Sequence, residues 1–511
     1  MASVEAPDTL AATWAARVDR RAEAVFLVYE DPDGRVTSWT YEEFDQLVGR
    51  VATTLVSHGV EPGSSVHMAL ANCPAFVATW LAVVRLGAWV VPSDPEAGAA
   101  ELQGHLRRTR PTVGLCASSR AGVYRSASRT LPVIEVEEPD PTLAAFRGGP
   151  VRSWPVPETT DRAAVMFTSG TTGTPKGVEV SQANYAFAGR TMARAAFLKE
   201  TDRQLVVLPL FHANAQYYSF ASSIWAGAGV ALMSSFTASG FLRQAVRHGA
   251  TTASLFAAPM RMILARGGPV DGIQLRHCWF AQNLAVEQYE TISGWFGCRP
   301  RQLYGMTETI PAVLTEVAEK PEPLSMGVVT EGCLVDVQRT DGTSVEVGEV
   351  GEVVVGGQRG TTLFAGYLDD PETTEASFRE GWFLTGDRAR RDDSGRHFFD
   401  GRRSEVLKVS GENVSIVEVE AVLAAHPGVL EAAVVGRSDP VRDEVPVAFV
   451  VVDPSECAPS RVDLESWCTE RLTKARRPVE FTFLDRLPRT SVGKIRKFLL
   501  RDPAGGEEGM R

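Results

Sequence analysis

Short apolar runs alternate with helical segments along the first 310 residues, and this alternation constrains the fold most strongly. Strand-like runs such as VFLVY, SSVHMAL and AWVVPS are separated by stretches such as residues 41–58, where Phe44, Leu47, Val51 and Leu55 recur at helical spacing. Strands that alternate with helices favour an α/β fold built on mainly parallel sheets.

The chain is too long for a single hydrophobic core. It has 511 residues, whereas cores stop growing near about 250–300 residues. After Met326 the sequence becomes β-rich, with DG, GG and SG turns, which predicts a small antiparallel or barrel-like region. A compact α+β pattern follows from about residue 403. We therefore expect a large N-terminal domain, residues 1–402, and a small C-terminal domain, residues 403–511.

The charge balance excludes several classes of partner. A formal net charge of −11 argues against nucleic acid and anionic membranes, which need clustered Lys and Arg. The N-terminal string MASVEAPDTLAATW is unlike a signal peptide, and the apolar runs are too short to predict a membrane span. The seven scattered cysteines indicate reduced thiols. These features predict a cytoplasmic globular protein.

One loop carries the strongest chemical signal. The string TSGTTGTPKG, residues 168–177, follows an apolar run that predicts a buried strand, and it holds three glycines and five hydroxyl residues. Such a loop is rich in N–H and O–H donors that can surround a polyphosphate, and Lys176 adds positive charge. It is not a Walker A loop, because Thr174 and Pro175 separate Gly173 from the lysine.

Three further motifs have side chains suited to a nucleotide. The string YGMTET begins at Tyr304, after a predicted strand end, where ligands bind in open α/β sheets. Its Glu308 is a carboxylate that can hold Mg²⁺. The string GWFLTGD ends at Asp387, whose carboxylate suits ribose hydroxyls, and a Gly-Arg pair ending at Arg402 follows. Near the C-terminus, a Gly-Lys pair places Lys494 on a loop.

In this order and spacing, the motifs resemble the core motifs of the ANL superfamily of adenylate-forming enzymes, which includes acyl-CoA synthetases. The resemblance runs from about residue 26 to residue 500, and within the superfamily it is strongest to crotonobetaine/carnitine–CoA ligase-like proteins. It implies an N-terminal domain of two α/β subdomains plus the barrel-like region, and a mobile α+β C-terminal domain. It also implies ATP, Mg²⁺ and CoA as cofactors and co-substrate, a small-molecule acid as substrate, and allows a homodimer.

The resemblance assigns roles to single residues. The loop would clamp the β- and γ-phosphates of ATP through Thr168, Ser169, Gly170, Thr171, Thr172, Gly173 and Lys176. Tyr304, beside Gly305 and Met306, would stack near adenine. Thr307 would contact the α-phosphate, and Glu308 would bind Mg²⁺. Asp387 and Arg402 would hold the ribose. Lys494 would bridge the acid carboxylate and the α-phosphate, where negative charge accumulates.

The acyl pocket is expected to be polar. His212 matches the position that gates the pocket in relatives. Gln282 and Asn283 belong to the string Ala281-Gln282-Asn283, which stands where many acyl-CoA synthetases have a Gly-Gly-Ala turn. The resemblance places Asn214, Gln216, Tyr217 and Tyr218 nearby. A buried amide without a partner costs about 1–3 kcal/mol, so we expect the acid or an ordered water to supply one. The preferred acid would then carry a hydrogen-bonding group.

Three readings of the function stay open at this level. The first is an acid–CoA ligase. The second is an adenylating enzyme that transfers the acyl group to a carrier-protein thiol, an amine or another nitrogen nucleophile, including nitrite-based diazotisation in specialised metabolism. The third is a non-catalytic ATP-binding paralogue, which the intact Lys494, Glu308 and Asp387 disfavour.

Overall fold

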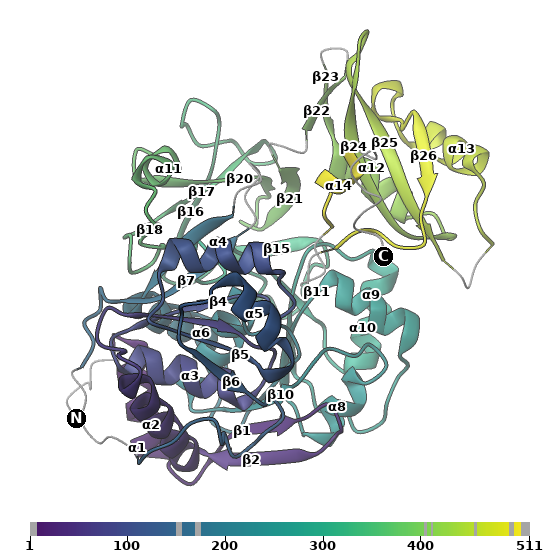
Figure 1. The fold of residues 1–511 in the computed structure, drawn as a ribbon. Helices are drawn as coiled ribbons and strands as arrows, with labels where there is room; N and C mark the ends of the chain where they lie inside the picture. The colour runs from purple at the N-terminus through teal and green to yellow at the C-terminus, as the bar shows by residue number, and fades with distance from the viewer. Residues whose placement is uncertain are drawn as a thin grey trace.

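The computed structural model describes residues 8–149, 156–168, 175–402, 406–409, 412–453, 457–489 and 495–501. Strands in these ranges form three sheets. Two belong to the large N-terminal part of the chain, and the third lies in the C-terminal part, at the upper right of Figure 1.

The first sheet has the order β18-β8-β7-β4-β3-β5-β6. Its strands are β3 (Ser65–Ala69), β4 (Trp89–Pro92), β5 (Val113–Ala117), β6 (Val133–Val136), β7 (Arg162–Thr168), β8 (Lys176–Ser181) and β18 (Gly366–Tyr367). The run from β7 through β4, β3 and β5 to β6 is parallel, and β7 and β8 form an antiparallel pair. β3 and β5 are buried along their whole length, which explains their continuous apolar sequences.

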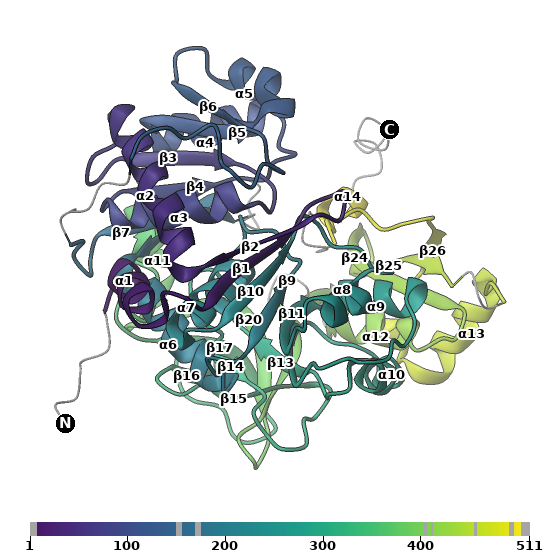
Figure 2. The ribbon, with the colours of Figure 1, turned by 90° about the horizontal axis from the view of Figure 1, so that it is seen from below.

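The second sheet is parallel over β13, β12, β11, β9, β10 and β1, with β2 antiparallel at the edge. These strands are β1 (Val25–Glu30), β2 (Val36–Thr40), β9 (Arg203–Val206), β10 (Gly229–Met233), β11 (Thr252–Phe256), β12 (His277–Ala281) and β13 (Arg301–Tyr304). Helices α2 and α3 lie between the first sheet and β1–β2 (Figure 2). The predicted α/β fold class is confirmed.

Antiparallel strands continue the second sheet beyond β13. They are β14 (Leu314–Thr315), β15 (Ser325–Val329), β16 (Leu334–Gln338), β17 (Val350–Gly356), β19 (Phe378–Arg379), β20 (Trp382–Arg391) and β21 (His397–Arg402). The pairing runs β14-β15-β21-β20-β17-β16, with β19 on β20. The predicted antiparallel region is therefore present. Among the described residues its pairing path is open, because the outer strand β16 pairs with β17 alone.

The C-terminal part has a sheet and a core of its own. Its strands are β22 (Val406–Val409), β23 (Glu412–Ser415), β24 (Val429–Asp439), β25 (Asp443–Val452) and β26 (Glu480–Phe483). Residues such as Val419, Val434 and Leu464 form a separate buried cluster. The expected boundary near residue 403 falls on residues 403–405, outside the described residues. The boundary therefore stays a prediction.

Helices cover both faces of the N-terminal sheets (Figures 1 and 2). The α-helices are α1 (Leu10–Arg21), α2 (Tyr41–Ser57), α3 (Pro74–Arg85), α4 (Ala99–Thr109), α5 (Ala121–Ala127), α6 (Gln182–Ala195), α7 (Ser222–Ala226), α8 (Phe241–Arg247), α9 (Ala257–Arg266), α10 (Val286–Phe296), α11 (Pro371–Ala376), α12 (Ile416–Ala424), α13 (Arg461–Arg471) and α14 (Phe498–Arg501). Three short segments are the 3₁₀-helices η1 (Ser118–Arg120) and η4 (Lys474–Arg476) and the π-helix η2 (Asn214–Ala221). None of the helices in the described residues is long and apolar enough to cross a bilayer.

Local sequence explains where the predicted helix over residues 41–58 begins. Thr40 accepts a hydrogen bond from the backbone N–H of Glu43, whose side chain in turn accepts one from the N–H of Thr40. This reciprocal cap satisfies two N–H groups that the first turn leaves unpaired. The apolar side of α2, including Phe44 and Val51, is then fully buried in the main core.

A chain of buried polar side chains crosses the first sheet. The Tyr124 hydroxyl lies 2.7 Å from His67 Nδ1, and Ser93 Oγ lies 2.9 Å from His67 Nε2 and 2.8 Å from His105 Nδ1. Each of the four is at most 7% exposed. Gly114 makes room for the tyrosine, because a Cβ there would lie 2.2 Å from the Tyr124 hydroxyl oxygen. Burial lowers the pKa of His67 to about 3 and that of His105 to about 4.

We expect the protein to lose stability as the pH falls below about 6.5, the ordinary pKa of histidine. Between that value and pH 4, the unfolded chain takes up protons that the folded His67 and His105 refuse, so acid favours unfolding. Thermal melts of the protein and of a His67→Gln variant between pH 7.5 and 5 test this. The variant should show the shallower dependence on pH, and equal slopes would contradict the assignment.

Candidate nucleotide and acyl site

Asp387 links three motifs that lie far apart in the sequence. Its Oδ2 accepts a 2.8 Å hydrogen bond from the hydroxyl of Tyr304, and its Oδ1 lies 2.9 Å from Nε of Arg402. The carboxylate is buried, at 3% exposure. β20 and β21 pair Asp387 with Arg402, and Tyr304 ends the parallel strand β13. Ligands of open α/β sheets bind at such carboxyl ends.

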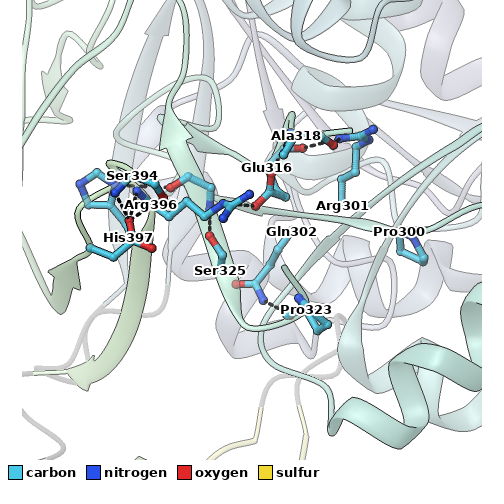
Figure 3. Close-up of polar contacts among 12 residues, drawn as sticks. Pro300, Arg301, Gln302, Glu316, Ala318, Pro323, Ser325, Ser394, Arg396 and His397 are labelled. Carbon is cyan, nitrogen blue, oxygen red and sulfur yellow. Dashed lines mark hydrogen bonds and ion pairs between the residues drawn. The ribbon is translucent and has the colours of Figure 1, made fainter. Parts of the chain in front are cut away.

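Polar contacts on the strands around β13 fix its position (Figure 3). Arg301 donates from Nη1 to the carbonyl of Ala318 at 2.5 Å, and Gln302 donates from Nε2 to the carbonyl of Pro323 at 3.3 Å. Arg396 of the β20–β21 hairpin lies with its Nε 3.5 Å from Oε2 of the buried Glu316. Arg301 and Gln302 thus bond β13 to the segment between β14 and β15, and Arg396 contacts the residue that follows β14. Since β13 also pairs with β14, Tyr304 and Asp387 lie in one connected sheet.

The turn after β13 is close-packed. A Cβ on Gly305 would come within 3 Å of the Pro311 carbonyl oxygen and the Tyr218 hydroxyl, so only glycine fits there. Thr309 Oγ1 accepts a 2.9 Å hydrogen bond from the N–H of Met306, which closes the turn. Met306 and Thr307 are half-buried in this turn, and the side chain of Glu308 is buried.

Glu308 faces the start of β8. Its Oε1 accepts a 3.1 Å hydrogen bond from the hydroxyl of Tyr367, and Nζ of Lys176 lies 4.6 Å from the centre of the Tyr367 ring. Lys176 pairs with Thr168 across the β7–β8 ladder, so both ends of the glycine-rich loop lie beside this cluster. A carboxylate there suits the oxygen preference of Mg²⁺. Residues Ser169, Gly170, Thr171, Thr172 and Gly173, like Lys494, lie outside the described residues.

The π-helix η2 contributes buried polar side chains, one of which is hydrogen bonded to the second sheet. Asn214 accepts a 2.9 Å hydrogen bond at Oδ1 from Ser254 Oγ of β11, while its Nδ2 is buried with no partner among the described residues. The hydroxyl of the fully buried Tyr217 also lacks a partner there, and burial raises its pKa well above the ordinary value. His212, half-buried, lies just before η2 with its ring centre 4.2 Å from that of Phe211.

Gln216 is hydrogen bonded within the protein on both sides of its amide. Its Oε1 accepts from the Tyr185 hydroxyl, and its Nε2 donates to the Leu210 carbonyl at 2.6 Å. It is fully buried. The amide therefore holds η2 in place, and a direct contact of Gln216 with an acid stays a prediction.

The prediction that Gln282 and Asn283 are buried amides is wrong. Both are exposed, because the chain turns outward after β12, with Gln282 in the left-handed region at φ 74°. Asn283 Oδ1 accepts a 3.1 Å hydrogen bond from Gln302 Nε2, and its carbonyl accepts one from Arg261 Nη1 at 3.2 Å. Their assignment to the acyl pocket therefore rests on the resemblance alone.

Trp279 is a candidate pocket residue that sequence reasoning missed. It pairs with Ser254 in the β11–β12 register, so both lie on the side of the sheet that meets η2. The tryptophan is 1% exposed, and its indole N–H has no partner among the described residues. The sequence HCWFA is typical of a buried apolar strand, so it gave no reason to single out the tryptophan. Its pairing with the buried Ser254 is visible only in the structure. Tyr367, the partner of Glu308, was missed in the same way.

Two family models match the chain, one over its N-terminal part and one over its C-terminal part. Residues 14–368 match the family described as AMP-binding enzyme, and residues 418–494 match the AMP-binding enzyme C-terminal domain. The chain belongs to the AMP-binding enzyme family. This AMP-binding enzyme is 30% identical over 489 residues to the crotonobetaine/carnitine–CoA ligase of Salmonella arizonae, covering 92% of this chain and 94% of the ligase. The ligase of Escherichia fergusonii is also 30% identical, over 94% of this chain and 96% of its own.

Solved structures share the fold of this AMP-binding enzyme. The anthranilate–CoA ligase AuaEII in complex with anthranoyl-AMP has a TM-score of 0.87 and 25% identity, with 96% of each chain covered. The O-succinylbenzoate coenzyme A synthetase of Bacillus subtilis in complex with ATP and magnesium has a TM-score of 0.84 and 29% identity, covering 96% of this chain and 99% of that one. The predicted family, enzyme class of AMP-forming ligase and two-part architecture are confirmed.

Replacing Asp387 by Asn should weaken AMP binding by roughly tenfold or more, because hydrogen bonds to a charged group are worth about 1.5–3 kcal/mol. Titration calorimetry with AMP measures this without any knowledge of the acid. Asp393→Asn, an exposed change in the turn of the same β20–β21 hairpin, is the matched control and should bind AMP normally. Unchanged affinity in Asp387→Asn would exclude the carboxylate from the nucleotide site.

Proposed function

We propose that this enzyme activates a carboxylic acid with ATP and transfers the acyl group to CoA. The observation that carries the proposal is the buried Asp387 carboxylate, bonded by Tyr304 and Arg402 at the carboxyl end of β13, with Glu308 close to the ends of the glycine-rich loop. The similarity to acid–CoA ligases over more than nine-tenths of the chain supports CoA as the acceptor.

In the first step, an oxygen of the acid carboxylate attacks the α-phosphorus of ATP. A bond forms between them, the bond to the β-phosphate bridging oxygen breaks, and pyrophosphate leaves. Lys494 and Thr307 would stabilise the charge that develops on the α-phosphate. Glu308 would hold Mg²⁺, which supplies further positive charge when bound. Asp387, Tyr304 and Arg402 would orient the ribose and adenine.

In the second step, the thiol of CoA gives its proton to solvent and its sulfur attacks the acyl carbonyl. The carbon–sulfur bond forms, the bond from the acyl carbon to the phosphate oxygen breaks, and AMP leaves with the bonding electrons. The two steps need different groups at one place. We propose that the C-terminal part, residues 403–511, turns about the segment after Arg402 and presents Lys494 in the first step only. Its separate hydrophobic core supports motion as a unit.

The products test this proposal. With ATP, Mg²⁺ and a panel of acids, the enzyme should release pyrophosphate and AMP, and mass spectrometry should find a CoA thioester only when CoA is present. ADP as product would overturn the adenylation step. Adenylate formation without thioester, followed by transfer to a carrier-protein thiol or a nitrogen nucleophile, would overturn CoA as the acceptor.

Three buried donors on η2 and β12 have no partner among the described residues, and they support a proposal about the class of acid. Asn214 Nδ2, the Tyr217 hydroxyl and the Trp279 indole N–H are all buried. Each costs about 1–3 kcal/mol while unpaired, and a plain alkyl chain would return no hydrogen bond. We propose that the acid carries a hydrogen-bond acceptor, such as a carbonyl, hydroxyl or amine nitrogen, that meets these donors.

The kcat/KM of the enzyme should therefore be low for acids with long, plain alkyl chains. In an apolar tunnel each CH₂ would add about 0.8 kcal/mol of burial, so kcat/KM would rise steadily from acetate to palmitate. Here we expect the enzyme to prefer acids that carry a hydrogen-bonding substituent. Trp279→Phe should lower kcat/KM for these acids by roughly tenfold and leave the KM for ATP unchanged. Trp295→Phe, on α10, is the matched control. Efficiency that climbs to the longest chains would refute a polar pocket.

A further inference from the structure

The two ends of the glycine-rich loop are held from outside by one helix. Phe167 is the second-to-last residue of β7. Its ring stacks on that of His105 of α4, with ring centres 4.0 Å apart and an angle of 3° between the ring planes. The guanidinium carbon of Arg108 lies 4.9 Å from the centre of the same Phe167 ring. His105 and Arg108 are three residues apart on α4 and therefore share one side of the helix.

Arg108 also reaches the other end of the loop. Its Nη1 donates a 2.6 Å hydrogen bond to the carbonyl of Pro175, the residue before Lys176. One side chain thus contacts the strand that leads into the loop and the residue that leads out of it. The ladder pairs Phe167 with Gly177 and Thr168 with Lys176, so the two contacts lie across the base of the loop.

A buried chain of hydrogen bonds supports these contacts from behind. His105 is tied through Ser93 and His67 to Tyr124, in the buried chain described above. The bonds form one consistent series if Tyr124 donates to His67, His67 to Ser93, and Ser93 to His105. Burial keeps both histidines neutral at physiological pH, so the series holds at working pH and fixes the ring against which Phe167 stacks.

A fixed base matters for a loop of this composition. Residues 168–177 contain three glycines, and glycine loses more backbone freedom on ordering than any other residue. If both ends already stand at a fixed separation and angle, Thr168 and Lys176 lose less freedom when they bind a polyphosphate. Hydrogen bonds with Thr373 lower the pKa of the Asp370 carboxyl most, and the charges of Lys176 and Arg108 lower it further, so both cations act on the same carboxyl.

We propose that Arg108 is a positioning residue for the β- and γ-phosphates of ATP, acting through the two loop ends that it joins, with His105 as its support. This rests on the proposed function, which assigns the loop to ATP. It goes beyond that function by giving phosphate binding a determinant on α4, outside the motifs that carry the resemblance.

The test compares two nucleotides that differ in the phosphates concerned. Calorimetry on the full chain measures two dissociation constants, one for α,β-methylene-ATP in the presence of Mg²⁺ and one for AMP. Arg108→Ala should weaken binding of the ATP analogue by roughly tenfold or more, the loss expected for a hydrogen bond to a charged group. AMP binding should stay within about twofold, because AMP lacks both phosphates. Arg108→Lys keeps the positive charge but loses the planar guanidinium group, so its affinity for the ATP analogue should lie between those of the unaltered enzyme and Arg108→Ala.

Arg107→Ala is the matched control, since Arg107 is the preceding, exposed residue of the same helix, and both affinities should match the unaltered enzyme. If Arg108→Ala does not fold, Phe167→Leu decides, because it removes the stacked ring and keeps the guanidinium. Unchanged affinity for the analogue, or an equal loss for AMP, would overturn the proposal. Failure of the unaltered enzyme to bind the analogue would instead count against the proposed function.

Discussion

The buried carboxylate of Asp387 is the interaction on which the site depends. Tyr304, at the end of β13, donates a hydrogen bond to it, and Arg402, at the end of β21, forms an ion pair with it. The side chain of Asp387 therefore joins the parallel strands to the antiparallel strands. Burying a carboxylate is costly unless hydrogen bonds or charges compensate for the lost water. The partners of Asp387 provide that compensation, and in doing so they fix the distance between the elements that would surround a nucleotide.

Around this centre the chain separates the regions that would contact phosphate and acid. Cationic and hydroxyl groups gather at the β7–β8 ends, where Lys176 lies over Tyr367. Neutral donors, such as those of Asn214 and Trp279, gather between η2 and the second sheet. Phosphates carry full charges, whereas the uncharged donors favour a neutral acceptor on the acid. Under the proposed function, the two chemistries would thus be served by different parts of the N-terminal domain.

Periodicity and motif order were enough to predict the fold class and the helix over residues 41–58, because both depend on local pattern. Contacts between distant segments were harder. The bond between Tyr304 and Asp387 joins motifs 83 residues apart. Whether Gln282 faces inward depends on a backbone turn at φ 74°, and Gln216 is satisfied by Tyr185, which no motif includes. Arg108 looked like one more charge on a helix, because nothing local shows that Pro175 lies beside it.

The position of Arg402 in the chain has a mechanical consequence. It ends β21, and the C-terminal part of the molecule begins just after it (Figure 1). A ligand that moves the guanidinium of Arg402 away from Asp387, or holds it there more firmly, acts on the end of β21. The C-terminal part follows that strand in the chain. Under the proposed function, filling of the nucleotide site and the orientation of the C-terminal part would therefore be coupled through a single side chain, and ATP, adenylate and AMP would each favour an orientation of their own.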